Sequence, residues 1–190
     1  NLILGGESVT EKQQFMKKVT ILCDTREQKN KHIITALDEM KVLHENRKLD
    51  FGDYSFIIDG RDFSLSCIIE RKGCVNELWT NTTKDRERFE KELTAAHNIA
   101  GSVNLLIENC SDWQSLKAYK VPEWEMKYQH RQVENIGEHI HNTLKSWCSH
   151  NRYGFEVHFS ENNKKSAACI LSVFYWYWHN YQQLTKPLRK

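Results

Sequence analysis

The stretch from residue 52 to residue 72 constrains the fold of this chain more than any other. It begins with the tripeptide GDY and ends with ERK, and between them two apolar runs flank the turn sequence DGRD. This pattern predicts a β-hairpin, which brings its two ends together. Because strand side chains alternate between the faces of a sheet, Glu70 and Lys72 should point to one face and Arg71 to the other. The hairpin then places the Asp53 carboxylate beside Glu70 and Lys72.

Two carboxylates and an ammonium group in one place suit a hard divalent cation. Mg²⁺ and Mn²⁺ prefer carboxylate oxygens and keep positions open for water and phosphate. Asp53 and Glu70 are therefore candidate metal ligands, and Lys72 is a candidate catalytic group beside them. The alternative is a weakly stabilising ion pair between Glu70 and Lys72, and the Glu-X-Lys pattern taken alone favours that alternative.

The rest of the chain alternates between strand-like and helix-like patterns. Apolar or alternating runs predict strands near residues 19–23, 43–49, 103–107 and 153–159. Apolar positions at three- and four-residue steps predict helices near residues 30–40, 84–100, 132–150 and 164–184. This order predicts an α/β fold with a central mixed β-sheet flanked by helices. Asp24 and Glu108 also end predicted strands, where ligands gather in open α/β sheets, and these further acids favour a metal site over a simple ion pair.

The chain of 190 residues is long enough for one domain with its own core. Residues 1–15 precede Met16 and are expected to be an N-terminal extension or an expression remnant. We therefore expect a single domain over residues 16–190, in which residues 109–150 form a loop-plus-helix insertion or a family-specific region.

Composition limits the partners and the compartment. The formal net charge is only +2, so any nucleic-acid surface must be local. The six cysteines are irregularly spaced and form no Cys-X-X-Cys pair, which argues against a disulfide framework or a cysteine-rich zinc site. No signal sequence or membrane-spanning stretch is recognisable, so we expect no membrane partner and a cytoplasmic location.

Four motifs together resemble the XPF/Hef-type family of structure-specific DNA nucleases. They are DTRE at residues 24–27, GDY at 52–54, ERK at 70–72 and LLIE at 105–108, and RERF at 86–89 extends the match. Their order and spacing are similar to those of the family over residues 19–108. The resemblance implies a restriction-endonuclease-like fold and cleavage of a DNA phosphodiester at a Holliday junction, fork or flap during recombination or repair. It also implies Mg²⁺ or Mn²⁺ as cofactor.

The resemblance assigns roles to residues in these motifs. It makes Asp24, Asp53 and Glu70 the acids of the metal site and Lys72 the catalytic lysine. It also marks Arg26 as a residue that supports activity. The chain has no paired helix-hairpin-helix signature after the nuclease motifs, and in this it is similar to the small stand-alone nucleases of phages and bacteria, such as junction resolvases. For a phage protein, the expected location is the host cytoplasm.

Four other positions have supporting roles or open interpretations. The resemblance marks Arg71 as a supporting residue. The family usually carries an acid four residues after the lysine, and here that position is Asn76, whose amide offers an oxygen but no charge. Glu27 fits the N-terminal end of a helix, where the macrodipole favours an acid. Glu108 is either an acid that reaches the metal through water or a surface group at the end of its strand.

Two groups of basic residues are candidates for DNA contact. Arg86 and Arg88 lie on a helix where acids alternate with bases, so a solvated face of ion pairs is the alternative. Lys117, Lys120 and Lys127 are interleaved with aromatic residues, as in surfaces that bind single strands or junctions. The alternative for this second group is an ordinary ordered loop.

The last predicted helix carries aromatic residues on more than one side. One wide apolar face fits core packing, whereas Tyr175 and Trp176 continue the aromatic residues around the other side. We therefore expect a homodimer through this helix, which would suit symmetric cleavage of a junction. Two other functions stay open: a catalytically degenerate module that only binds branched DNA, and a restriction-type endonuclease acting on duplex DNA.

Overall fold

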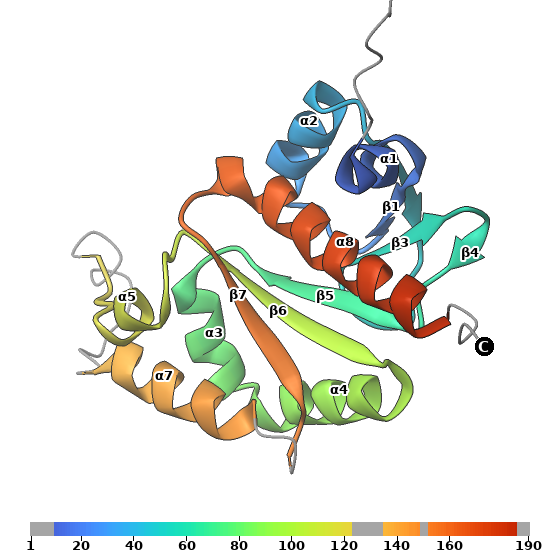
Figure 1. Cartoon of the computed structure of the whole chain (residues 1–190). Coiled ribbons are helices and arrows are strands. Elements are labelled where there is room, and N and C mark those ends of the chain that lie inside the picture. Colours follow the sequence, from blue (N-terminus) through green and yellow to red (C-terminus); the bar gives the residue numbers. More distant parts are fainter. Residues whose placement is uncertain (1–9, 123–134, 149–151, 186–190) are drawn as a thin grey trace, which may run out of the picture.

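The computed structural model describes residues 10–122, 135–148 and 152–185. Its centre is a seven-stranded sheet with the order β2-β1-β3-β5-β6-β7 and with β4 paired to β3 (Figure 1). The strands are β1 (Thr20–Asp24), β2 (Leu43–Arg47), β3 (Tyr54–Ile58), β4 (Arg61–Asp62), β5 (Cys67–Lys72), β6 (Ser102–Glu108) and β7 (Phe155–Ser160). Strand β3 is antiparallel to both β1 and β5, whereas β1–β2, β5–β6 and β6–β7 are parallel pairs. The predicted mixed sheet is confirmed.

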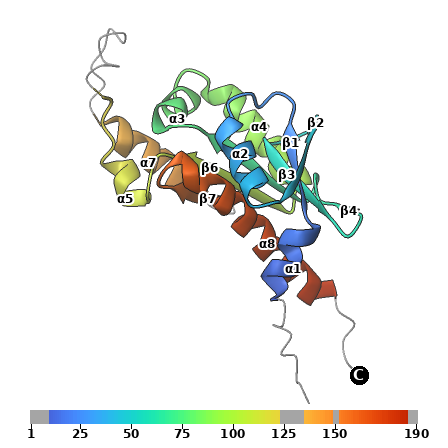
Figure 2. The ribbon, with the colours of Figure 1, turned by 90° about the horizontal axis from the view of Figure 1, so that it is seen from above.

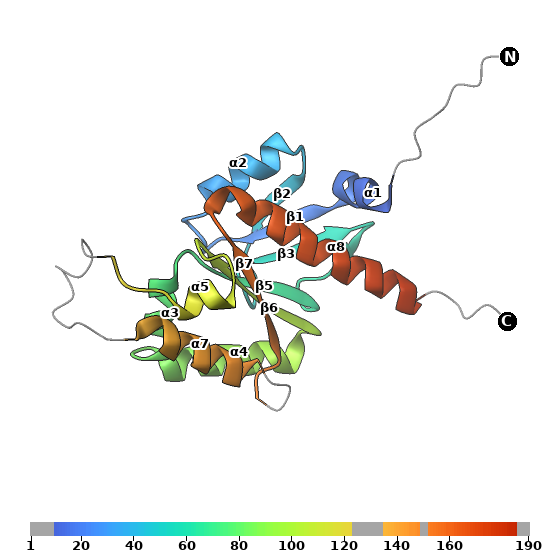
Figure 3. The same ribbon diagram turned by 60° about the vertical axis from the view of Figure 1, so that its left-hand side comes forward.

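Helices cover both faces of the sheet. They are α1 (Glu11–Lys18), α2 (Lys31–Glu39), α3 (Val75–Thr82), α4 (Arg86–Ile99), α5 (Trp113–Lys117), α7 (Ile136–Trp147) and α8 (Ser166–Thr185). One core contains residues of α1, α2 and α8, and a second contains residues of α3, α4 and α7 (Figures 1 and 3). The long helix α8 and the short helix α1 lie side by side, as Figure 2 also shows. Within the described ranges, no helix combines the length and the apolar character needed to cross a membrane.

Helix α1 (Glu11–Lys18) spans residue 16, where the domain was predicted to begin. Thr10 and Gln13 form a capping box that starts the helix. Phe15 is fully buried and contacts the rings of Phe56 and Trp178. The described part of the segment that was expected to be an extension therefore belongs to the domain. A single buried aromatic residue gives no periodicity, so the sequence pattern did not reveal this contact.

Residues 109–150 contribute to the second core. Leu116 from α5 and Ile140 from α7 are buried with it. The two helices meet closely at Gly137, where a Cβ atom would lie 2.5 Å from the carbonyl oxygen of Leu116. The predicted helix over residues 132–150 is present as α7, whereas residues 123–134 and 149–151 lie outside the described ranges.

Helix α3 was not predicted. The segment after Lys72 was expected to break the strand, and in the structure Val75 and Leu78 of that region are buried on α3. Two turns contain too few apolar positions for a helical period to be recognised. This helix carries Asn76, and so it determines where that residue lies.

Gly52, two residues before β3, has a positive φ and lies very close to the backbone of β5. Its φ of +70° lies in the left-handed region, and a Cβ atom there would be only 2.9 Å from the carbonyl oxygen of Ile69. The same carbonyl accepts a hydrogen bond from the backbone N–H of Asp53 at 2.8 Å. Glycine therefore lets the chain approach β5 closely enough for Asp53 to join it.

We expect Gly52→Ala to lower the free energy of unfolding by about 2–4 kcal/mol. The left-handed conformation costs a non-glycine residue about 1–2 kcal/mol, and the overlap with the Ile69 carbonyl adds to this cost. Urea denaturation measures the loss. Gly60→Ala is a matched control because Gly60 has a φ of +73° but no atom within 4 Å of the added Cβ. Equal losses in the two variants would contradict the close-approach explanation.

Candidate active site

The predicted hairpin brings Asp53 to the side of β5. Tyr54 and Ile69 are paired across β3 and β5. The backbone N–H of Arg71, the residue that follows Glu70, donates to Oδ2 of Asp53 at 2.7 Å. Asp53 and Glu70 are thus neighbours across the hairpin, as the sequence predicted.

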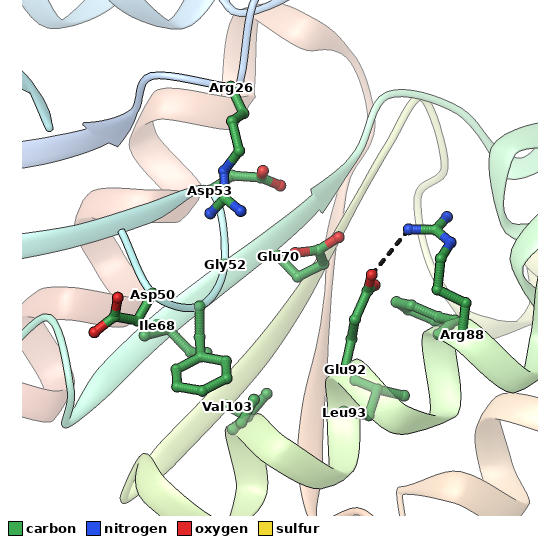
Figure 4. Close-up of a pocket in the computed structure, with 13 residues that line it drawn as sticks. Arg26, Asp50, Gly52, Asp53, Ile68, Glu70, Arg88, Glu92, Leu93 and Val103 are labelled. Atoms are coloured by element: carbon green, nitrogen blue, oxygen red, sulfur yellow. Dashed lines mark hydrogen bonds and ion pairs between the residues drawn. The ribbon is translucent and has the colours of Figure 1, made fainter. Parts of the chain in front are cut away.

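These two acids line one cavity. It has a volume of about 250 Å³ and lies between residues 50–53, β5, β6 and α4. Figure 4 shows Asp53 and Glu70 at its upper end, with the side chain of Arg26 extending toward Asp53. Asp50 and Glu92 also line it. These two acids come from a turn and a helix, so no common sequence motif indicated that they share the cavity.

Burial and the nearby negative charge of Glu70 raise the pKa of Asp53 to about 8, although the Arg71 N–H opposes the shift. Two carboxylates this close in a partly enclosed site resist being charged together. A cation bound between them would offset the repulsion.

The donor set fits a cation held by few protein ligands. Among the described residues, no group of three or more His, Cys, Asp or Glu side chains is placed to hold a metal ion. Mg²⁺ is commonly bound through one or two carboxylates, with substrate phosphates and water completing the shell. Asp53 and Glu70 meet that requirement.

Lys72 lies on the same face of β5 as Glu70. Its Nζ is 2.8 Å from Oε1 of Glu70 and 4.7 Å from the centre of the Phe89 ring. The ion pair that the alternative interpretation predicted is present, but the Lys72 side chain is only 8% exposed. Burial favours the neutral amine, yet the charge of Glu70 and its hydrogen bond outweigh burial and raise the pKa of Lys72. A lysine held as a cation suits stabilisation of negative charge better than removal of a proton from water.

Asp24, the predicted third metal acid, accepts hydrogen bonds through both of its carboxylate oxygens. Its Oδ1 accepts hydrogen bonds from the backbone N–H and Nε of Arg26, both at 2.7 Å. Its Oδ2 accepts from Nη2 of Arg26 at 3.0 Å and from the backbone N–H of Leu49 at 2.7 Å. Burial opposes ionisation, but these bonds outweigh it and hold the pKa of Asp24 below its usual range. Asp24 therefore holds Arg26, and its role as a third metal acid stays a prediction.

Arg26 links Asp24 to the acid pair. Its pKa is raised mainly by the hydrogen bonds to Asp24, and the charges of Asp53 and Glu70 contribute. Its side chain is 62% exposed and lines the cavity. A guanidinium group in this position can contact a phosphate beside the carboxylates. The predicted supporting role of Arg26 therefore has a plain geometric basis.

Arg71 points to the opposite face of β5, as the alternation predicted. Its Nη1 is 2.7 Å from Oε2 of Glu108, and its Nη2 is 3.0 Å from Oε1 of Glu27. Nε2 of His32 lies 2.8 Å from the other oxygen of Glu108. This buried network ties β5 to β6 and to the segment between β1 and α2.

The network changes the interpretation of two acids. Glu27 pairs with Arg71 and does not begin a helix, because α2 starts four residues later. Glu108 is 1% exposed, so it is not a surface group. Both acids face Arg71, which supports β5 from the side opposite the cavity.

Asn76 and its neighbour Glu77 lie in the first turn of α3. Asn76 is half-buried. Oε2 of Glu77 accepts a hydrogen bond from the backbone N–H of Gly73 at 3.0 Å, and its charge helps to raise the pKa of Lys72. The acid of α3 that acts on Lys72 is therefore Glu77, which lies one residue after Asn76, the position where the family usually has an acid. The sequence contained this signal, but the comparison by exact spacing missed it.

The arginine candidates for DNA contact form ion pairs within α4. Arg86 pairs with Glu90 at 2.9 Å, and Arg88 pairs with Glu92 at 2.8 Å. This is the solvated pattern that the alternative predicted. Arg88 nevertheless lines the cavity, and Figure 4 shows its pair with Glu92 there. The guanidinium of Arg86 lies over the ring of Trp147 instead.

Neither Lys117 nor Lys120 lines this cavity. Nζ of Lys117 is 3.6 Å from Glu138, and Lys120 is exposed. Lys127 lies outside the described residues. Their role in DNA contact stays a prediction.

Comparison with known proteins identifies the family. Residues 23–173 match the ERCC4 domain. The chain belongs to the ERCC4 domain family. The resemblance to XPF-type nucleases is thus confirmed over most of the chain, including the region around α5 and α7. A search of curated proteins found no match.

Solved structures of ERCC4-type proteins share the fold. XPF from Aeropyrum pernix is similar with a TM-score of 0.56 and 18% identity, over 90% of this chain and 75% of that chain. The structure of XPF from Aeropyrum pernix in complex with DNA has the same TM-score of 0.56 and 18% identity, over 90% of this chain and 69% of that one. These likenesses confirm the restriction-endonuclease-like fold.

The raised pKa of Asp53 predicts how stability depends on pH when metal is removed. Above about pH 4, where an unfolded aspartate loses its proton, the folded protein still holds that proton until about pH 8. Its stability should therefore fall as the pH rises through this window. Asp53→Asn removes the group whose ionisation destabilises the folded state. The stability of this variant relative to wild type should therefore increase from pH 5 to pH 8.5. Urea unfolding in the presence of EDTA measures this difference.

Asp50→Asn serves as the control, because Asp50 lines the same cavity but is exposed. Its stability relative to wild type should change less over the same pH range. An Asp53→Asn variant whose relative stability did not change with pH would contradict the proposed repulsion between Asp53 and Glu70.

Proposed function

We propose that this protein is a divalent-metal-dependent, structure-specific endonuclease that hydrolyses a phosphodiester at branched DNA, such as a Holliday junction, fork or flap. The observation that carries the proposal is the half-buried pair of Asp53 and Glu70 beside the cationic Lys72. Membership of the ERCC4 family, whose members are structure-specific DNA endonucleases, supports it. A cytoplasmic protein acting in recombination or repair is part of this proposal.

Each residue of the site has a defined task in this proposal. Asp53 and Glu70 would hold Mg²⁺ or Mn²⁺, which when bound supplies Lewis-acid stabilisation and an acidified water. The ammonium of Lys72 would stabilise the charge that develops on the phosphate oxygens. Arg26, held by Asp24, would position the phosphate by hydrogen bonding. Arg71 would act indirectly by fixing β5 through Glu27 and Glu108.

DNA as the partner has separate support. XPF from Aeropyrum pernix, which shares the fold, is known in complex with DNA. In this chain Arg26 and Arg88 line the cavity of the acid pair, so two guanidinium groups are available near the proposed scissile phosphate. They offset part of the negative charge that would otherwise repel the DNA backbone.

A second candidate is a degenerate module that binds branched DNA without cutting it. Asn76 in place of the usual acid favours this candidate, as does the lack of a three-acid group among the described residues. Such a module would need no divalent cation for affinity and would release no products. The same experiment therefore separates the two candidates.

We expect the purified protein to cut a Holliday junction, fork or flap in the presence of Mg²⁺ or Mn²⁺ and to be inactive in EDTA. Asp53→Asn, Glu70→Gln and Lys72→Met should each lower the single-turnover rate by about 100-fold or more, because each removes a charge from the reacting centre. Denaturing gels with end-labelled strands measure the rate and map the incisions.

Lys91→Ala is the control, since Lys91 forms an exposed pair with Glu87 and lies outside the site. Its rate should equal that of wild type. Activity retained in Asp53→Asn or Glu70→Gln would contradict the assignment. Equal cleavage of linear duplex would favour a restriction-type endonuclease.

The proposal includes a homodimer through α8, although the structure reduces the surface for it. Tyr175, expected to face a partner, packs against Phe15 of α1, and its hydroxyl lies 3.4 Å from Glu11. Trp176 is 56% exposed and is the aromatic residue of this pair that stays available. The dimer would therefore be centred on Trp176.

Sedimentation velocity at micromolar concentration should show a dimer for the wild-type protein. Trp176→Asp should shift it to a monomer, because a charge would be buried in the interface. Lys164→Asp, at an exposed position just before α8, is the control and should leave the dimer intact. A wild-type monomer would remove the dimer from the proposal.

A further inference from the structure

The cavity beside the acid pair has a second, apolar part that phosphate chemistry does not require. Ile68 from β5, Leu93 and Ala96 from α4, and Val103 from β6 line it. Each of these side chains is at most 5% exposed. Figure 4 shows Leu93 and Val103 at the opposite end of the cavity from Asp53. Phe51 also lines the cavity, so an aromatic ring is present as well.

The charges around the cavity select what can enter this part. Four acids, Asp50, Asp53, Glu70 and Glu92, and two arginines, Arg26 and Arg88, line the whole cavity. The apolar part, lined by Ile68, Leu93, Ala96 and Val103, offers no cation to a second phosphate. It allows the uncharged, flat part of a nucleotide, which gains from leaving water against an apolar wall.

The size of the cavity suits a small occupant such as a single base. Its volume of about 250 Å³ lies below the roughly 300–1,000 Å³ of sites for drug-sized ligands. A base inside a duplex is stacked and paired, so it must be extruded before it can enter such a pocket. The cost of extrusion is smallest for a base that is already single-stranded.

We propose that this apolar part receives one unpaired nucleobase adjacent to the scissile phosphate. The base would lie against the wall formed by Ile68, Leu93 and Ala96, and its own phosphate would lie at Asp53 and Glu70. The substrate class is then branched DNA in which the base beside the cut can leave the stack, as it can in the duplex next to the branch point of a fork or flap. A continuous duplex is a poor substrate because its bases are not free to enter. This inference rests on the proposed nuclease function.

The experiment combines a change in the DNA with a change in the protein. A fork substrate is prepared with an abasic nucleotide on either side of the mapped incision, and a third version carries it several nucleotides away in the same strand. Single-turnover cleavage with Mg²⁺ and binding in EDTA by fluorescence anisotropy are both measured. For the wild-type protein, the abasic nucleotide on one side of the incision should lower cleavage or affinity about tenfold, whereas the distant one should have no effect.

Ala96→Met fills the apolar part of the cavity without altering its charged residues. Ala95→Met is the matched control, because Ala95 is on the same helix but lines a different hollow beside Tyr153. With the intact fork, Ala96→Met should lower cleavage or affinity about tenfold relative to wild type. Ala95→Met should leave both unchanged. With the abasic fork, Ala96→Met should show no further loss, because the pocket and the base act as one interaction.

Ala96→Met adds volume beside buried side chains, so urea unfolding checks that it folds. Phe51→Ala is the second variant, and it should likewise lose most of its sensitivity to the abasic nucleotide. Equal cleavage and binding of intact and abasic forks by the wild-type protein would overturn the base pocket while leaving the nuclease proposal intact. Full sensitivity to the abasic nucleotide in both variants would also overturn it. A protein that neither bound nor cut any branched substrate would overturn the proposed function itself.

Discussion

The backbone of Asp53 is bonded to strands on both of its sides, and the candidate site depends on these bonds. Its carbonyl accepts a hydrogen bond from the N–H of Asp24 at 2.8 Å, and its N–H donates to the carbonyl of Ile69 at 2.8 Å. The residue is thereby fixed between β1 and β5. The N–H of Arg71 donates to the carboxylate at 2.7 Å and holds it beside Glu70, so the fold keeps the two acids close together. Stored repulsion of this kind is what a bound cation can relieve.

The two faces of β5 are electrostatically different. On one face, Arg71 is buried with Glu27 and Glu108, and each acid has a cationic partner. On the other face, Lys72 alone pairs with Glu70, while Asp53 keeps a raised pKa. The face on which Arg71 pairs with both acids stabilises the strand. The face on which Asp53 has no cationic partner of its own among the described residues can accept a bound cation. Alternation of side chains along a single strand produces both from three consecutive residues.

Much of the fold and of the site could be predicted from the sequence where the pattern is local. Periodicity located the strands and the long helices α4, α7 and α8, and the alternation of ERK placed Glu70 and Arg71 on opposite faces. Two elements were missed, because α3 is short and Phe15 is the single buried residue of α1. Asp24 was correctly placed at a strand end, but its hydrogen bonds to Arg26 and Leu49 could not be foreseen from spacing. Nothing local distinguishes a carboxylate that holds an arginine from one that holds a metal.

The sequence by itself determined the hairpin, the order of the acids and the family. These depend on residue type and on the two-residue period of a strand, which are properties of neighbouring residues. Only the tertiary structure decided which acids remain available, that Glu77 acts on Lys72, and that the acid pair opens into an apolar cavity. Those features depend on distances between segments far apart in the chain, such as α4 beside residues 50–53. Packing of these segments sets which groups are buried and which lie close together, and burial and proximity determine the charge state of each group.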